Sequence, residues 1–337
     1  MSPTHTPASF SSLPPELVIL VFQAACSDDD GTTALSLSSF SRSFYVSALP
    51  LIYRVIAVHD LGRVNLLNEH LQREPWHTTY VQHILVAERS SRLDCSGFEN
   101  ALRTLWGFVS PTMQSLTLHI RSRDTDVDKA FQTVFDTSFP YLTDLTLCGD
   151  HPIPSMSLAM PALKRFHSAG LARRNAAGCF APLSESCPDL SHIRISMASE
   201  KNITYAISAA FDLPDAPTDV ERMCLDPVPI MSRDDNQEPA RTPFPVLPSK
   251  LVSLVVKPAA PPMTLFARAT SMFYNQYLKQ LKALVPACPR GKFYLLPAYK
   301  REMWEVESYS IVDAKRDWVD AMRGGNGSWS VDGAERT

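Results

Sequence analysis

The sequence predicts an α/β solenoid, with parallel strands and outer helices, preceded by a small all-α module of three helices. Three observations support this fold class. A short apolar motif recurs eight times between residues 53 and 256, at intervals of 21 to 32 residues, which is the repeat length of a solenoid. Helical periodicity fills several of the intervals. The segment ahead of these copies carries the signals of three short helices.

The first helix of the module is expected to begin at Pro14 and Pro15, because proline suits the first turn, where its missing N–H would be unpaired anyway. The next run, 17–22, is apolar on all sides, so this helix must be covered on more than one face. Two shorter helices, at about 33–40 and 41–49, can cover only part of it. Since a unit this small buries a limited fraction of its surface, we expect the uncovered face to bind a partner.

The order of residues in this module resembles an F-box. It opens on Leu-Pro at 13–14, continues with an aliphatic helix, carries Ser-Arg-x-aromatic-Tyr at 41–45 and closes on Leu-Pro-x-x-Tyr at 49–53. The acidic insert at 28–30 is similar to inserts in F-box proteins of filamentous fungi and mushrooms. Phe40 departs from the pattern, since many F-boxes have a bulky aliphatic residue before Ser-Arg. The other interpretation of the segment is an ordinary buried helical hairpin.

Membership of this family implies docking onto the Skp adaptor of a cullin–RING ubiquitin ligase. Eight residues are then expected to form the adaptor-binding surface and the small core of the module: Leu13, Pro14, Leu17, Leu20, Val21, Phe40, Phe44 and Leu49.

The recurring motif is an apolar residue, two spacers, a second apolar residue, one spacer and a third apolar residue. Its central positions are Ile56, Ile84, Leu116, Leu145, Phe166, Ile193, Met223 and Leu254. Proline precedes six of the eight central positions by five or six residues. Because proline ends the preceding segment and favours extended backbone in its neighbour, each copy is expected to be a turn followed by a strand with one buried face.

Apolar residues recur at spacings of three and four in the intervening segments 98–109, 127–134 and 203–210, as in amphipathic helices. Strand, turn and helix at this period resemble an irregular leucine-rich repeat over about residues 50–300. Where that family has Asn or Cys, three residues after the motif, this chain has Arg121 and Asp150. We therefore expect a looser stack than a smoothly curved horseshoe.

Four parts are expected: a disordered N-terminus at 1–11, the F-box module at 12–54, the leucine-rich-repeat-like solenoid at 55–323 and a flexible tail at 324–337. Within the solenoid, 226–248 holds six prolines and a polar run, so we expect a mobile loop. Two helices should follow, one near 264–285 and one carrying Ala314 and Trp318 on one face. We expect them to cap the open end of the array.

Composition limits the function classes. A net charge of -3, a pI near 6.3 and the lack of a basic stripe argue against a nucleic-acid partner. Apolar runs fall short of the roughly 20 residues of a membrane span, and no signal peptide is expected at the N-terminus. Seven irregularly spaced cysteines are typical of reduced thiols, so we expect a cytoplasmic or nuclear protein.

The sequence shows no glycine-rich phosphate loop, no Gly-x-Ser-x-Gly and no Cys-x-x-Cys or His-x-x-x-His spacing. The acidic triplet 28–30 and the cluster of His59, His70, His77 and His83 could bind a cation, but solvation and packing explain both. We expect no catalytic residues, no cofactor and no metal site.

The sequence therefore predicts a non-catalytic substrate receptor of an SCF-type ubiquitin ligase, with the Skp adaptor, the cullin and an unknown protein target as partners. The alternative is an interaction scaffold outside ubiquitin transfer; a third possibility is an enzyme whose site is assembled from distant residues. Outward-pointing strand residues on the concave face are the expected target surface. His167 and Arg194 are its expected contacts, since arginine and aromatic residues dominate binding hot spots. The C-terminal helices or the Pro-rich loop are the other candidates.

Overall fold

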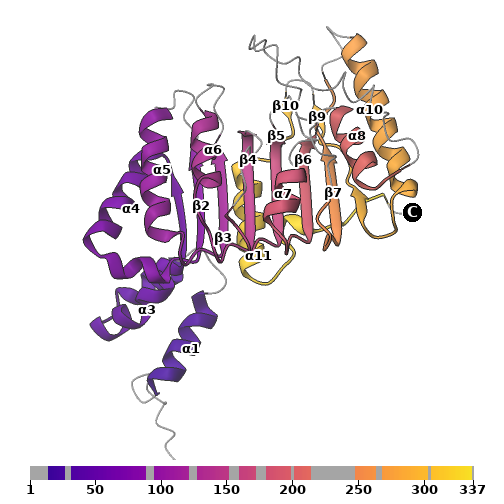
Figure 1. Ribbon diagram of the computed structural model, residues 1–337. Helices are drawn as coiled ribbons and strands as arrows, with labels where there is room; N and C mark the ends of the chain where they lie inside the picture. The colour runs from indigo at the N-terminus through magenta and orange to yellow at the C-terminus, as the bar shows by residue number, and fades with distance from the viewer. Residues whose placement is uncertain are drawn as a thin grey trace, which may run out of the picture.

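The computed structural model describes residues 14–26, 32–88, 95–120, 127–151, 159–171, 180–198, 201–213, 247–262, 268–302 and 305–335. Eight parallel strands form one sheet, and their order across the sheet is their order in the sequence (Figure 1). They are β1 Val55–His59, β2 His83–Glu88, β3 Ser115–Ile120, β4 Asp144–His151, β5 Arg165–Leu171, β6 His192–Ala198, β7 Ser253–Pro258 and β8 Phe293–Leu295. The arrangement is solenoid-like, which confirms the coarse α/β fold class.

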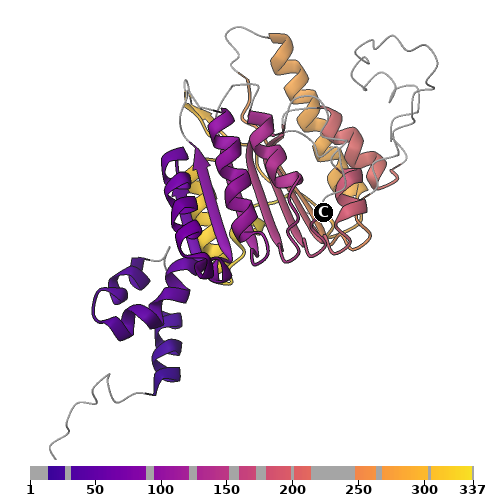
Figure 2. The ribbon, with the colours of Figure 1, turned by 60° about the vertical axis from the view of Figure 1, so that its left-hand side comes forward.

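The outer helices lie side by side on one face of the sheet (Figure 2). They are α4 Leu61–Arg73, α5 Cys95–Val109, α6 Val127–Phe135, α7 Phe180–Ser186, α8 Lys201–Ala210 and α10 Arg268–Ala287. Their apolar side chains and those of the strands form one core, in which Trp106 is the largest fully buried side chain. Its indole N–H donates to the Thr133 hydroxyl at 2.9 Å, so the polar atom is satisfied inside the core. The three helical segments expected between strands are confirmed as α5, α6 and α8.

The recurring motif lines up in register across the sheet. Its central residues lie opposite one another from strand to strand: Ile56, Ile84, Leu116, Leu145, Phe166, Ile193 and Leu254. All of them except Ile56 are fully buried beneath the outer helices. Because side chains alternate along a strand, the residues on either side of each central position point to the opposite face, which we call the inner face.

Proline turns set the start of several strands. The N–H of Leu142 donates to the carbonyl of Phe139, and Pro140 occupies the second position of this four-residue turn. The same turn, with proline at the same position, precedes β5 and β6. Proline's fixed φ suits this position, so each turn delivers the first apolar residue of the motif into the core and leads into the strand.

The copy of the motif centred on Met223 does not add a strand where the sequence predicts one. Strand β6 is hydrogen-bonded directly to β7, with Ile193 opposite Leu254, so no strand lies between them. The copy itself lies outside the described residues, as do 1–11 and most of the Pro-rich loop 226–248. At the far edge, β8 is an eighth strand that the motif did not predict.

Both C-terminal helices are confirmed, but the second one is not an end cap. Helix α10 packs beside α8 and β8 at the end of the solenoid. Helix α11 (Ile311–Met322) and the 3-10 turn η4 (Gly327–Trp329) lie across the inner face, opposite the outer helices (Figures 1 and 2). A capping box between Ser310 and Asp313 starts α11. Beyond η4, Glu335 bridges to Leu295 of β8, so the segment expected to be a flexible tail contributes to the folded chain.

Among the described helices, none combines the length and apolar character needed to cross a membrane.

Candidate functional site

The N-terminal module consists of α1 Pro15–Cys26, α2 Thr32–Ser38 and α3 Arg42–Arg54. Its small core is built around Phe22, which is 1% exposed, together with Ala34, Ala48 and Leu49. The Phe22 ring meets the Phe44 ring edge to face at 5.1 Å. Helix α3 begins at the Ser-Arg of the motif: the Ser41 hydroxyl accepts a hydrogen bond from the N–H of Phe44 and caps the helix. The three helices thus share one core, but it is only a few side chains deep.

The module exposes much of its apolar surface. Its exposed large apolar side chains, which we call the docking face, are Leu17, Ile19, Leu20, Val21, Leu35, Phe40, Tyr45 and Val46. They are half of the sixteen exposed large hydrophobic residues in the described chain, although the module supplies only 36 described residues. Phe40 is 75% exposed and Leu20 57%. Such a concentration of exposed apolar side chains marks a binding surface more often than an ordinary surface.

The eight residues predicted for this site divide between the surface and the core. Pro14, Leu17, Leu20, Val21 and Phe40 are exposed, Phe44 is half-buried, Leu49 is buried, and Leu13 lies outside the described residues. Sequence reasoning missed Ile19, Leu35, Tyr45 and Val46. The helical period of α3 could not have found Tyr45, because it lies three and four residues before the buried Ala48 and Leu49 and therefore on the same side of the helix.

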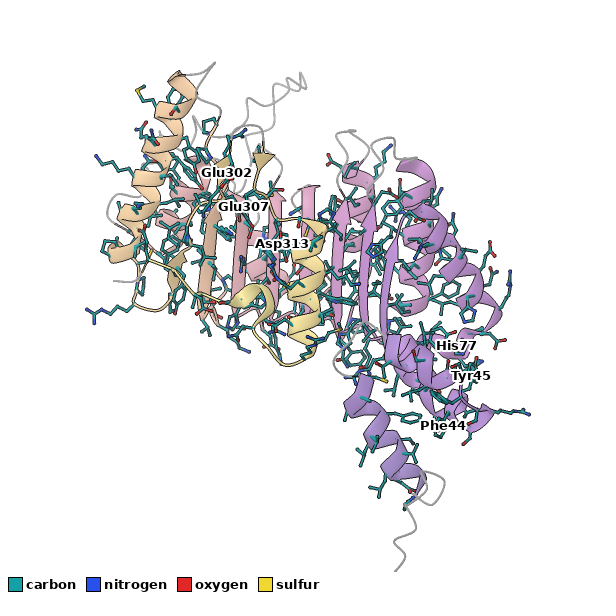
Figure 3. All side chains as sticks on the ribbon, turned by 180° about the vertical axis from the view of Figure 1, so that it is seen from behind. Phe44, Tyr45, His77, Glu302, Glu307 and Asp313 are labelled. Atoms are coloured by element: carbon teal, nitrogen blue, oxygen red, sulfur yellow. The ribbon has the colours of Figure 1, made fainter. Side chains whose placement is uncertain are left out.

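A stack of aromatic rings joins the module to the solenoid, where α3 runs directly into β1. The Tyr53 hydroxyl lies 2.8 Å from His70 Nε2, which lies 2.9 Å from His77 Nδ1. The Tyr53 and His77 rings stack with centroids 4.1 Å apart, and Trp76 covers His77 from the 3-10 helix η2 (Pro75–Tyr80). Helix α3 contacts η2 at this junction, where Figure 3 labels His77. Burial, with a smaller effect of His70, lowers the pKa of His77, which favours the neutral ring at physiological pH.

The predicted histidine cluster therefore does not form one site. His70 and His77 meet at the junction, whereas His83 lies on the inner face of the sheet. In the part of the chain that the structure describes, no group of three or more His, Cys, Asp or Glu side chains is arranged to hold a metal ion. The acidic triplet 28–30 lies outside that part.

The outward-pointing strand residues predicted as one target-binding row are Thr117, Thr146, His167, Arg194, Cys224 and Val255. Five of them lie opposite one another across β3 to β7, and Cys224 lies outside the described residues. His167 is 0% exposed and Arg194 is 7% exposed, and the Trp329 ring of η4 lies 6.4 Å from the His167 ring. The Tyr309 ring lies 4.8 Å from the His167 ring. The expectation of an exposed concave target surface at His167 and Arg194 is therefore wrong for the chain in this conformation.

A crevice of about 210 Å³ lies between α11, η4 and strands β2 to β5. His83 Nδ1 lies 2.9 Å from Ser115 Oγ inside it. Burial, followed by the nearby Arg54, lowers the pKa of His83 to about 4. An imidazole with so low a pKa is a weak base at neutral pH, and the Asp144 carboxylate that could orient it is paired with Arg165. The crevice therefore offers Ser115 no strong activating base.

No family model matches this sequence, and a search of the curated proteins finds no match. The interpretation of the module is therefore based on its own residues and geometry.

Proposed function

We propose that the chain is a non-catalytic substrate receptor of a cullin–RING ubiquitin ligase of the SCF type, and that its docking face binds the Skp adaptor. The observation that supports this proposal is the concentration of exposed apolar side chains on three short helices whose sequence follows the F-box pattern. Transfer of ubiquitin would then be performed by other subunits, while this chain raises the local concentration of a target.

The charge distribution of the module fits a protein–protein interface. In its described residues the charged side chains are Glu16, Arg42 and Arg54 alone. The centres of protein interfaces are depleted of charge and enriched in aromatic side chains, and Phe40 and Tyr45 supply the latter. A helical hairpin buried within one domain would hide these residues, whereas here they are exposed.

The junction gives the module a defined place relative to the solenoid. The Tyr53, His70 and His77 stack packs the last turn of α3 against η2, and α3 continues into β1 without a linker. A receptor must hold its target at a fixed distance from the ligase, and a direct connection suits that task better than a flexible linker.

Titration calorimetry of the full chain with a purified Skp adaptor tests the proposal. Leu20→Ser and Phe40→Ser should each weaken binding at least tenfold, about 1.4 kcal/mol, because each removes exposed apolar area from the interface. Met272→Ser, an exposed apolar residue on α10, is the matched control and should bind as the wild type does. All three variants should unfold at nearly the wild-type temperature. Wild-type affinity in both docking-face variants would refute the proposal, and co-capture of a cullin separates a ligase receptor from a scaffold.

A further inference from the structure

The inner face of the sheet has the composition of a surface that meets water or a partner. Its polar side chains include His83, Ser115, Thr117, Asp144, Thr146, Arg165, His167, His192, Arg194, Ser196 and Lys257. The outer face of the same strands is almost entirely apolar. A permanently covered face would be expected to be apolar too, since burying polar groups is unfavourable unless each is hydrogen-bonded.

The cover that α11 provides fits this face incompletely. The hydrogen bond from the Trp318 indole N–H to Ser115 Oγ is long, at 3.3 Å. A crevice of about 210 Å³, partly open to solvent, remains between the helix and the strands. His167 bonds through Nε2 to Ser196 at 2.9 Å, but its Nδ1 is buried without a hydrogen-bond partner among the described residues. The inner face therefore has unused hydrogen-bonding capacity under α11.

The contacts of α11 indicate which kinds of side chain the inner face can bind. The indole of Trp318 packs on Leu85 and Ala87 of β2, and Ala314, one turn earlier, packs with small residues of β4 and β5. Carboxylates accompany this apolar stripe: burial lowers the pKa of Lys257, and the nearby Glu307, Asp313 and Asp317 partly oppose that shift. Figure 3 shows Glu307 and Asp313 on this side of the sheet. The inner face is thus matched to a helix with a small residue, an aromatic residue one turn later and flanking acids.

The chain that follows the C-terminal end of α11 would allow the helix to move away from the sheet while the C-terminus stays in place. Gly324 and Gly327 follow it with φ of 80° and 51°, a backbone region that glycine adopts freely. Farther on, Glu335 bridges to Leu295 and pairs with Lys282 of α10 at 2.9 Å. These anchors are separate from the contacts of α11 with the sheet.

We propose that α11 is a displaceable cover, and that the inner face of β2 to β5 binds an acidic amphipathic helix of a partner protein in its place. The partner helix would carry a small residue and an aromatic residue at i and i+4, with Asp or Glu at the positions that Asp313 and Asp317 hold in α11. Such binding is the insertion of a helix into a groove, in competition with a segment of the same chain. It does not depend on adaptor docking.

Hydrogen exchange of the wild-type full chain tests whether the cover opens. Amides in the middle of α11 should exchange at least a hundredfold faster than those in the middle of α5, with little dependence on denaturant, because a local opening exposes little surface. If α11 and α5 amides instead exchange through the same denaturant-dependent global unfolding, the cover is a fixed part of the fold and the proposal fails.

A binding assay tests the chemistry of the groove. The probe is a fluorescent synthetic peptide with the sequence of residues 308–324, measured by anisotropy against the full chain. The Trp318→Ala chain, whose own cover is weakened, should bind the probe at least tenfold more tightly than the wild type. Val312→Ala, a change at an exposed position of α11, is the matched control and should behave as the wild type does.

A second peptide with Trp318 replaced by alanine should lose at least tenfold in affinity, and added salt should weaken binding of the first peptide. Equal binding of the two peptides, or no binding to a folded Trp318→Ala chain, would overturn the proposal. If that chain fails to fold, the Ala314→Ser chain replaces it in the assay, and the exchange measurement on the wild type decides whether the cover opens.

Discussion

Acidification should destabilise the chain through His83. Its pKa falls from 6.5 to about 4 in the folded chain, because burial under α11 and the charge of Arg54 disfavour the imidazolium. The unfolded chain then binds more protons than the folded chain at mildly acid pH, so stability is complete above pH 6.5 and is lost as the pH falls towards 4. The difference between the two values corresponds to about 3.4 kcal/mol below pH 4, and to about 2 kcal/mol at pH 5.

Urea unfolding of the wild type and of His83→Gln at pH 7 and pH 5 measures this contribution. Glutamine keeps a polar group within reach of Ser115 but does not titrate. Burial also lowers the pKa of His77, His167 and His192, so the wild type should lose more stability than His83 alone explains. The loss between pH 7 and pH 5 should be smaller in His83→Gln by about 2 kcal/mol. Equal losses in the two proteins would show that His83 is not desolvated and that α11 does not cover it as described.

Two further predictions concern the backbone and the thiols. Gly149→Ala should destabilise the chain by at least about 1 kcal/mol, because φ is 125° and a Cβ would lie 2.1 Å from the carbonyl oxygen of Ile120. Gly107→Ala, at an exposed position in α5 where a Cβ meets nothing within 4 Å, should instead stabilise it by about 0.5–1 kcal/mol in the same thermal unfolding assay. Burial raises the pKa of Cys187 to about 12 and that of Cys148 further still, so maleimide should label both only as fast as the chain unfolds. Mass spectrometry of labelled peptides checks this, and fast labelling of either residue in the native chain would contradict the described burial.

The repeat architecture could be predicted from the sequence because two local signals agree in it. Period-two alternation gives each strand one buried face, and proline before the strand fixes the turn, as at Pro140. The structure departs from this prediction where the local signals are present in a segment but a neighbouring strand to pair with is not available. The motif around Met223 satisfies the pattern, but β6 already pairs with β7, and register is decided by neighbouring strands rather than by one segment.

The placement of α11 could not be predicted, because amphipathicity shows which side of a helix is buried and not which surface buries it. The face carrying Ala314 and Trp318 was identified, yet an end cap and a sheet cover would show the same stripe. His167 and Arg194 are buried because the C-terminal segment lies over the inner face, so the prediction that they are exposed was wrong. In the module, the apolar excess was evident from composition, but only the packing around Phe22 separates core from docking face.

The central claim is that the docking face of α1 to α3 binds a Skp adaptor. Hydrogen exchange of the full chain, measured by mass spectrometry with and without saturating adaptor, tests it most directly. We expect slower exchange in peptides from residues 15–54, and unchanged exchange in the core helices α5 and α6. Unchanged exchange throughout the module, or protection that appears on the solenoid instead, would contradict it.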